Sequence, residues 1–193
     1  IDALITAERS AVAAAALLGQ PASALREDEL RERVVEVVRL LELLGKYGLE
    51  HFTAHKEALF EATRRMMEAE IAGIPNGSYS GEGYVYYDGR HEGTKFTIRV
   101  DIEVSERKIR FDYSRTDRQT NGFVNGTFTS SASATILTLL QMSNPDIPHN
   151  EGMVEPIEIV IPEGTILNAS YPKATTFGNH LCPPNADAIQ RAL

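Results

Sequence analysis

The chain has 193 residues, 42% of them hydrophobic and 24% charged, which is enough apolar material for one core or two small ones. Its 27 acidic and 19 basic residues give a formal net charge of -8, which argues against binding to nucleic acid or anionic membrane surfaces. The longest apolar stretch, residues 11–19, is too short to span a bilayer and lacks the preceding basic segment of a signal peptide, so we expect a cytoplasmic protein.

Residues 1–75 have the spacing of helices. Apolar residues in the first twenty positions fall mostly on one helical face, and Gly19 and Pro21 would end that helix. A second helix follows Ser23, a residue type that caps helix N-termini. A third runs from about Phe52 to Ala72. We expect a helical hairpin or bundle arm, whose second helix offers its neighbour a seam of Leu30, Val34, Val37, Leu41 and Leu44.

From Tyr79 onward the pattern changes to that of strands. Apolar and polar residues alternate over 95–104 and again over 109–113 after a polar turn, which predicts an antiparallel hairpin. Residues 83–89 are predicted to form the strand before it. Small residues followed by leucines at 130–143 predict a helix packed closely on the sheet, ended by the prolines of 144–148. Residues 157–161 alternate once more as a further strand.

Together these elements predict an α+β fold, in which an N-terminal helical arm is followed by a mostly antiparallel sheet with packed helices. The change of period predicts two segments, 1–75 and 76–193. The chain opens without methionine in a helical pattern and closes in another without a capping glycine. We therefore expect both segments to be parts of a larger subunit.

Standard motifs for metal or nucleotide chemistry are missing from the sequence. His51 and His55 share one face of the third predicted helix, but the helical zinc motif has a glutamate after its first histidine and this chain does not. Cys182 is the single cysteine, so it forms neither an internal disulfide nor a zinc-binding pair. Neither a phosphate-binding glycine loop nor a nucleophile elbow occurs. The sequence predicts no metal site in this chain.

Three polar loops are better candidates, because sites are commonly carried on loops held by a rigid scaffold. They span residues 112–122, 144–152 and 175–185. A structural interpretation is open for each: a strand exit with an Asn-Gly turn, a proline-directed helix end, and a glycine at a close backbone approach beside a buried cysteine. In the last loop that interpretation leaves Asn179 and His180, and Lys173 just before them, without a reason.

Residues 112–179 resemble the hydantoinase B/oxoprolinase family in the order of their parts. That order is an Asp-Tyr-Ser strand end, an asparagine opening a small-residue helix, a Pro-Asp-Ile-Pro segment, a Pro-Glu-Gly turn before Leu-Asn, and a Gly-Asn loop. Residues 47–52 and 73–79 look like the family as well. The matching residues here are Asp112–Ser114, Asn125 with 130–134, Pro145–Pro148 with Asn150 and Gly152, Pro162–Gly164 with Leu167 and Asn168, and Gly178 with Asn179.

Within that family, the segments TTFGNHLC and SRTDRQTNG look closest to the large subunit of the ketone carboxylases that act on acetone. The resemblance implies a hetero-oligomer in which ATP drives carboxylation of acetone by bicarbonate to acetoacetate. It also implies a hydantoinase A-like subunit that handles the nucleotide, a small third subunit, and manganese held elsewhere in the complex. This chain alone is expected to be inactive. ATP-dependent opening of hydantoin or 5-oxoproline, and a structural module that assembles such a complex, remain open as alternatives.

The resemblance places the candidate site in the Gly-Asn loop. We expect Gly178 to shape the loop at the substrate, Asn179 to donate to an oxyanion, and His180 to act as acid, base or orienting group. Arg115 and Lys173 are candidates for holding bicarbonate or a phosphorylated intermediate. In the alternative, the loop shapes a subunit interface and His180 is a buried hydrogen-bonding group.

Overall fold

The computed structural model describes residues 27–193, with side chains for Val35 and from Val37 onward. The chain divides into two compact units, residues 1–58 and 59–193. The helix expected in the first twenty residues, the Ser23 cap, and the side chains of Leu30 and Val34 lie outside the described residues. The division expected after residue 75 stays a prediction.

Two helices follow each other in the first unit, α2 (Glu27–Tyr47) and the first turns of α3 (Leu49–Ala72). They meet at Gly48, whose φ of 78° is a backbone conformation that glycine adopts at no steric cost. α3 begins three residues earlier than predicted, because Phe52 N already donates to the Gly48 carbonyl at 3.1 Å. Of the described seam residues, Val37 and Leu44 are half-buried and Leu41 is 55% exposed.

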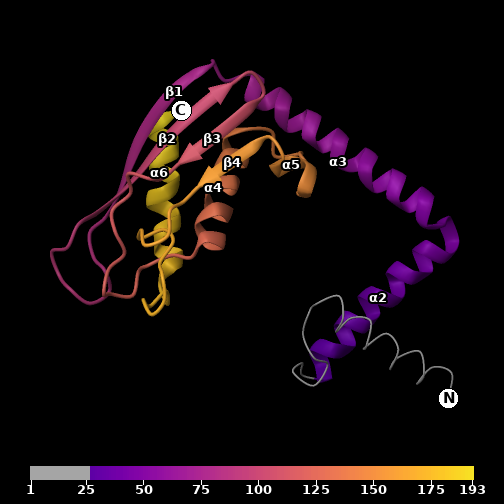
Figure 1. Cartoon of the computed structure of the whole chain (residues 1–193), viewed down its shortest axis with the longest axis horizontal. Helices are drawn as coiled ribbons and strands as arrows, with labels where there is room; N and C mark the ends of the chain where they lie inside the picture. Colours follow the sequence, from indigo (N-terminus) through magenta and orange to yellow (C-terminus); the bar gives the residue numbers. More distant parts are fainter. Residues whose placement is uncertain (1–26) are drawn as a thin grey trace. The chain divides into compact units, whose positions relative to one another are not determined.

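A four-stranded sheet in the order β1-β2-β3-β4 forms one layer of the second unit (Figure 1). β1 (Gly77–Val85), β2 (Phe96–Ser105) and β3 (Lys108–Asp112) are antiparallel neighbours, which confirms the predicted hairpin. β4 (Ile157–Val160) instead runs parallel to β3. The strand predicted over residues 83–89 has the wrong bounds, because β1 begins at Gly77 and ends at Val85. The residues that open β1 are rich in glycine and carry no alternating apolar signal.

Helices cover one face of this sheet (Figure 1). α6 (Cys182–Ala192) packs on β1 and β2, and α4 (Phe128–Met142) lies beside α6. The short helix α5 (Glu151–Val154) was not predicted; it begins where the Asn150 side chain accepts a hydrogen bond from Gly152 N at 2.9 Å. The single turn η2 (Gly178–Leu181) leads directly into α6. These elements confirm the α+β fold.

The alternating strand residues form the core, as predicted. Ile98, Val100 and Ile102 on β2 and Ile109 and Phe111 on β3 are buried together with the last turns of α3 and the inner faces of α4 and α6. None of the helices in the described part of the chain combines the length and apolar composition needed to cross a bilayer.

Candidate functional site

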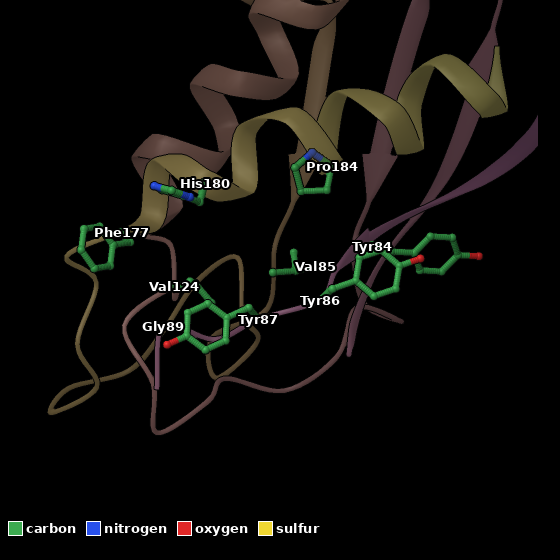
Figure 2. A pocket seen from close by; sticks show the side chains of 9 residues that line it. All are labelled: Tyr84, Val85, Tyr86, Tyr87, Gly89, Val124, Phe177, His180 and Pro184. Atoms are coloured by element: carbon green, nitrogen blue, oxygen red, sulfur yellow. The ribbon is translucent and has the colours of Figure 1, made fainter. Parts of the chain in front are cut away.

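A groove of about 590 Å³ opens at the loop end of the second unit (Figure 2). Its walls come from three segments: the end of β1 with the loop after it, the loop before α4, and the turn η2 with the first residues of α6. Most of the lining is aromatic or aliphatic, and one imidazole lies at its edge. The lining residues are Tyr84, Val85, Tyr86, Tyr87, Gly89, Val124, Phe177, His180 and Pro184.

His180 lies in this groove and is exposed, so the alternative of a histidine buried within this chain is not what the structure shows; burial at a subunit interface stays open. Its backbone N–H donates to the Phe177 carbonyl at 3.0 Å, which closes the turn that precedes α6. The two rings meet edge to face, with centroids 5.6 Å apart and planes at 66°. The imidazole therefore lies exposed against an aromatic residue of the groove wall.

Asn179 and Gly178 have different surroundings from their neighbour. Asn179 is exposed, does not line the groove, and its carbonyl accepts the backbone N–H of Cys182. Gly178 is buried, and a Cβ added there would lie 2.8 Å from the Asn125 carbonyl oxygen. Glycine is therefore required at position 178, because the backbone of Asn125 comes too close for a side chain. A contact between Gly178 and substrate stays a prediction.

The two predicted anion-binding side chains, Arg115 and Lys173, do not line the groove. Arg115 is paired with Asp101 of β2, with Nε 2.6 Å from Oδ2, and this hydrogen bond raises the pKa of Arg115. Lys173 Nζ donates to the Asn121 side-chain oxygen. The structure thus places His180 in the same groove as three tyrosines, whereas Arg115 and Lys173 bond to Asp101 and Asn121. Binding of bicarbonate by Arg115 or Lys173 stays a prediction.

A buried polar network behind the groove was missed by the sequence reasoning. The Asp88 carboxylate accepts hydrogen bonds from the backbone N–H groups of Arg90 and His91, the His91 ring and the Thr120 hydroxyl. Burial by itself would raise the pKa of Asp88, but these bonds outweigh it and hold the pKa well below its usual value. The Asp-Gly pair at 88–89 was a local signal for a turn but gave no sign of these partners.

Tyrosine and cationic side chains gather where β1 enters the groove. The Tyr84 hydroxyl donates to Glu82 at 2.8 Å, and this bond raises the pKa of Tyr84. Lys95 Nζ lies 4.0 Å from the centroid of the Tyr84 ring, at cation–π distance. One ammonium group therefore lies against an aromatic residue of the groove lining.

The manganese implied by the resemblance does not fit these residues. Across residues 27–193, no three His, Cys, Asp or Glu side chains converge in a way that could hold a metal ion. His51 and His55 are tied by a hydrogen bond from the His55 ring to the His51 carbonyl, at 2.8 Å from Nδ1. The described residues therefore offer no set of side chains that would hold manganese.

Comparison with known proteins places the chain in a family. The model of the hydantoinase B/oxoprolinase family matches residues 34–193, which is most of the sequence. The chain belongs to the hydantoinase B/oxoprolinase family. A putative D-/L-hydantoinase subunit from Pseudomonas sp. (strain NS671) is 30% identical over 165 residues, covering 80% of this chain and 28% of that protein. The chain thus spans little more than a quarter of this relative.

Two solved structures share the fold of this family member. An ATP-dependent caprolactamase from Pseudomonas jessenii aligns with a TM-score of 0.76 and 23% identity over 90% of this chain and 30% of its own. A nucleotide-free acetone carboxylase, solved in work on ATP-dependent acetone carboxylation, aligns with a TM-score of 0.72 and 19% identity over 86% of this chain and 24% of its own. At these identities the likeness establishes the fold.

Proposed function

We propose that this chain is part of the large subunit of an ATP-dependent ketone carboxylase that converts acetone and bicarbonate to acetoacetate. The observation that carries the proposal is the exposed His180 imidazole at the edge of a groove with aromatic and aliphatic walls. Such walls suit a small, uncharged ketone better than a charged substrate. The resemblance of the segments TTFGNHLC and SRTDRQTNG to the ketone carboxylases supports the same assignment.

The proposed chemistry divides between this chain and its partners. Acetone must lose an α-proton, and His180 accepts it while the C–H electron pair forms a C=C bond and the C=O π pair moves onto the oxygen, which gives the enolate. Asn179, one residue before His180 in η2, lies outside the groove lining and would have to turn toward the groove to donate its side-chain N–H to that oxygen. The enolate carbon then forms a bond to the carboxyl carbon of carboxyphosphate, made from bicarbonate and ATP, while the bond from that carbon to the phosphate oxygen breaks and inorganic phosphate leaves. A hydantoinase A-like subunit would supply that activation of bicarbonate. The complex would also contain a small third subunit, and its manganese would be bound outside residues 27–193.

The test is acetone-dependent bicarbonate fixation by the full complex carrying His180→Ala. The matched control is His149→Ala, which removes another exposed loop histidine that does not line the groove. We expect fixation to fall by roughly 10²–10⁴-fold in the first variant and to be unchanged in the second. Native mass must show that both complexes assemble. Normal fixation by an assembled His180→Ala complex would remove this loop from the chemistry.

A second candidate is ATP-dependent opening of a cyclic amide, such as hydantoin or 5-oxoproline. The 30% identity to a hydantoinase subunit favours it. Substrate-dependent ATP hydrolysis separates the two enzymes: acetone stimulates the carboxylase, whereas hydantoin or 5-oxoproline stimulates the amide-opening enzyme. Stimulation by the cyclic amide alone would replace the carboxylase assignment.

A third candidate is a structural module that holds partner subunits together. Exposed apolar side chains of α2 and the start of α3 favour it, since large exposed apolar residues commonly mark partner surfaces. They are Val35, Leu40, Leu41, Leu43, Tyr47 and Leu49.

A further inference from the structure

Asp88 joins the segments that build the groove. It is 1% exposed and lies between the groove residues Tyr87 and Gly89, in the loop that follows β1. Its Oδ1 accepts the backbone N–H groups of Arg90 at 2.9 Å and His91 at 2.6 Å, which folds this loop into a turn. Its Oδ2 accepts the Thr120 hydroxyl at 2.7 Å, from the loop that carries Val124 of the groove wall. One carboxylate thus ties two of the three wall segments together.

The third wall segment is attached through the backbone. The Asp88 carbonyl accepts Phe123 N at 2.7 Å, and the Phe123 carbonyl accepts Phe177 N at 3.0 Å. Edge-to-face ring contacts follow the same route, with centroids 6.4 Å apart between Phe123 and Phe177 and 5.6 Å apart between Phe177 and His180. An unbroken series of contacts therefore runs from Asp88 to the imidazole.

Close packing allows this series little freedom. A Cβ on Gly122 would lie 2.2 Å from the Asp88 carbonyl oxygen and 2.7 Å from its Oδ2. Asn125, which is fully buried, accepts Thr120 N at 2.7 Å and donates to the Ala174 carbonyl at 2.9 Å. The loop after β1 and the loop before α4 are therefore packed without free space between them. A displacement at Asp88 must move the neighbouring residues as well.

A buried charge is an expensive way to hold a loop. Desolvating a carboxylate costs several kcal/mol unless hydrogen bonds compensate, and neutral groups can cap turns at lower cost. Asp88 gains four donors, and two of them are backbone groups that fix its own turn. Charge-assisted bonds of this kind are stronger and shorter than neutral ones, which favours a single rigid arrangement.

We propose that Asp88 is a positioning residue: its buried carboxylate fixes the loops that form the groove and thereby sets the place of the His180 imidazole. As an account of catalysis this rests on the proposed function of the groove. The structural role of Asp88 rests on the contacts alone, so its structural role and its catalytic role can be refuted separately.

The experiment compares Asp88→Asn with a matched control, Asp112→Asn. Asp112 is the last residue of β3 and, like Asp88, accepts a backbone N–H, that of Ser114 at 2.8 Å, but it does not line the groove. The first readout is the NMR spectrum of the His180 ring in the 193-residue chain, identified by its loss in His180→Ala. We expect Asp88→Asn to shift these ring resonances and Asp112→Asn to leave them in place.

Asparagine at position 88 keeps one oxygen for the two backbone donors but places an amide NH₂ where Oδ2 receives Thr120. Should Asp88→Asn fail to fold, Thr120→Val removes the hydrogen bond from Thr120 to Asp88 without any change in charge, and we expect it to shift the His180 ring resonances as well. Unshifted His180 resonances in a folded Asp88→Asn or Thr120→Val chain would overturn the proposal. So would equal shifts in Asp112→Asn, because the effect would then be general.

The second readout is acetone-dependent fixation by the full complex. A displaced proton acceptor lowers kcat by on the order of 10²-fold while KM changes little, since binding to the groove walls is retained. If the wild-type complex fixes no bicarbonate with acetone but the ring resonances still shift, the proposed function fails and the positioning role of Asp88 stands. Shifted resonances with unchanged kcat in an active complex would overturn the catalytic part of the proposal.

Discussion

Replacing Gly83 by alanine should separate α6 from the sheet. Gly81 and Gly83 lie on the same face of β1, and α6 presents Pro184 and Ala188, one helical turn apart, to that face. A Cβ on Gly83 would lie 1.7 Å from the Pro184 carbonyl oxygen and 2.7 Å from its carbonyl carbon. An ordinary contact needs 3.4 Å, so the helix backbone would have to withdraw by about 1.7 Å, the difference between the two distances.

The expected cost follows from the rigidity of both partners. The atoms in the way are helix backbone, which cannot rotate aside as a side chain can. Overpacking of this kind costs typically about 1–3 kcal/mol, against a gain of roughly 0.5–1 kcal/mol from replacing glycine in a strand. For a chain of this length each kcal/mol lowers Tm by about 2–4 °C. We therefore expect a net loss of stability and a Tm lower by several degrees.

Thermal and urea unfolding followed by circular dichroism measure this effect. Gly77→Ala is the matched control, because its Cβ would lie 3.8 Å from the nearest atom, in the Tyr79 side chain. This variant should be neutral or slightly more stable than the wild type, since it gains strand propensity without a clash. Equal Tm values for Gly83→Ala and Gly77→Ala would refute the close approach of α6 to β1.

Three further predictions concern other parts of the chain. Tyr113→Phe removes a buried hydroxyl that lies 2.8 Å from Thr135 Oγ1, and should cost about 1 kcal/mol in urea unfolding; Tyr79→Phe, whose hydroxyl bonds Pro75 at the surface, should cost less, and the reverse order would contradict the burial argument. The lowered pKa of Asp88 means that its stabilising effect is fully present above the unfolded value of about 3.9 and is lost as pH falls through and below it. The Tm difference between wild type and Asp88→Asn should thus be largest near pH 7 and shrink below about pH 4; a difference independent of pH would show that the charge is not responsible. Leu41→Ser should weaken assembly of the full complex by native mass while changing the stability of the isolated chain by less than about 0.5 kcal/mol; Glu42→Gln is the exposed control, and intact assembly with Leu41→Ser would exclude this part of α2 from the partner surface.

The sequence predicted most of the fold because its signals are local. Alternation over 95–104 and 109–113 required one face to be buried, and the structure buries Ile98, Ile102 and Phe111 on that face. The prediction from alternation failed at β1 for a physical reason. The buried face of that strand carries Gly81 and Gly83 where apolar side chains would normally stand, because α6 takes their space.

The candidate site was only partly predictable. The Gly-Asn loop was found from its order of residues, and His180 does line a groove. Tyr84, Tyr86 and Tyr87 were missed as lining residues, since a run of tyrosines after a strand has no fixed position until the loops close around it. Arg115 and Lys173 were chosen for their charge, but their partners, Asp101 and Asn121, lie 14 and 52 residues away.

The amino-acid sequence by itself determined the α+β class, the antiparallel hairpin of β2 and β3, and the family, because periodicity and motif order are properties of neighbouring residues. Only the tertiary structure decided that β4 runs parallel to β3, that Asp88 bonds Thr120 across 32 residues, and that Asn125 bonds the Ala174 carbonyl across 49. These contacts depend on how loops far apart in the chain meet around a shared core. That meeting is set by packing, which no local pattern records.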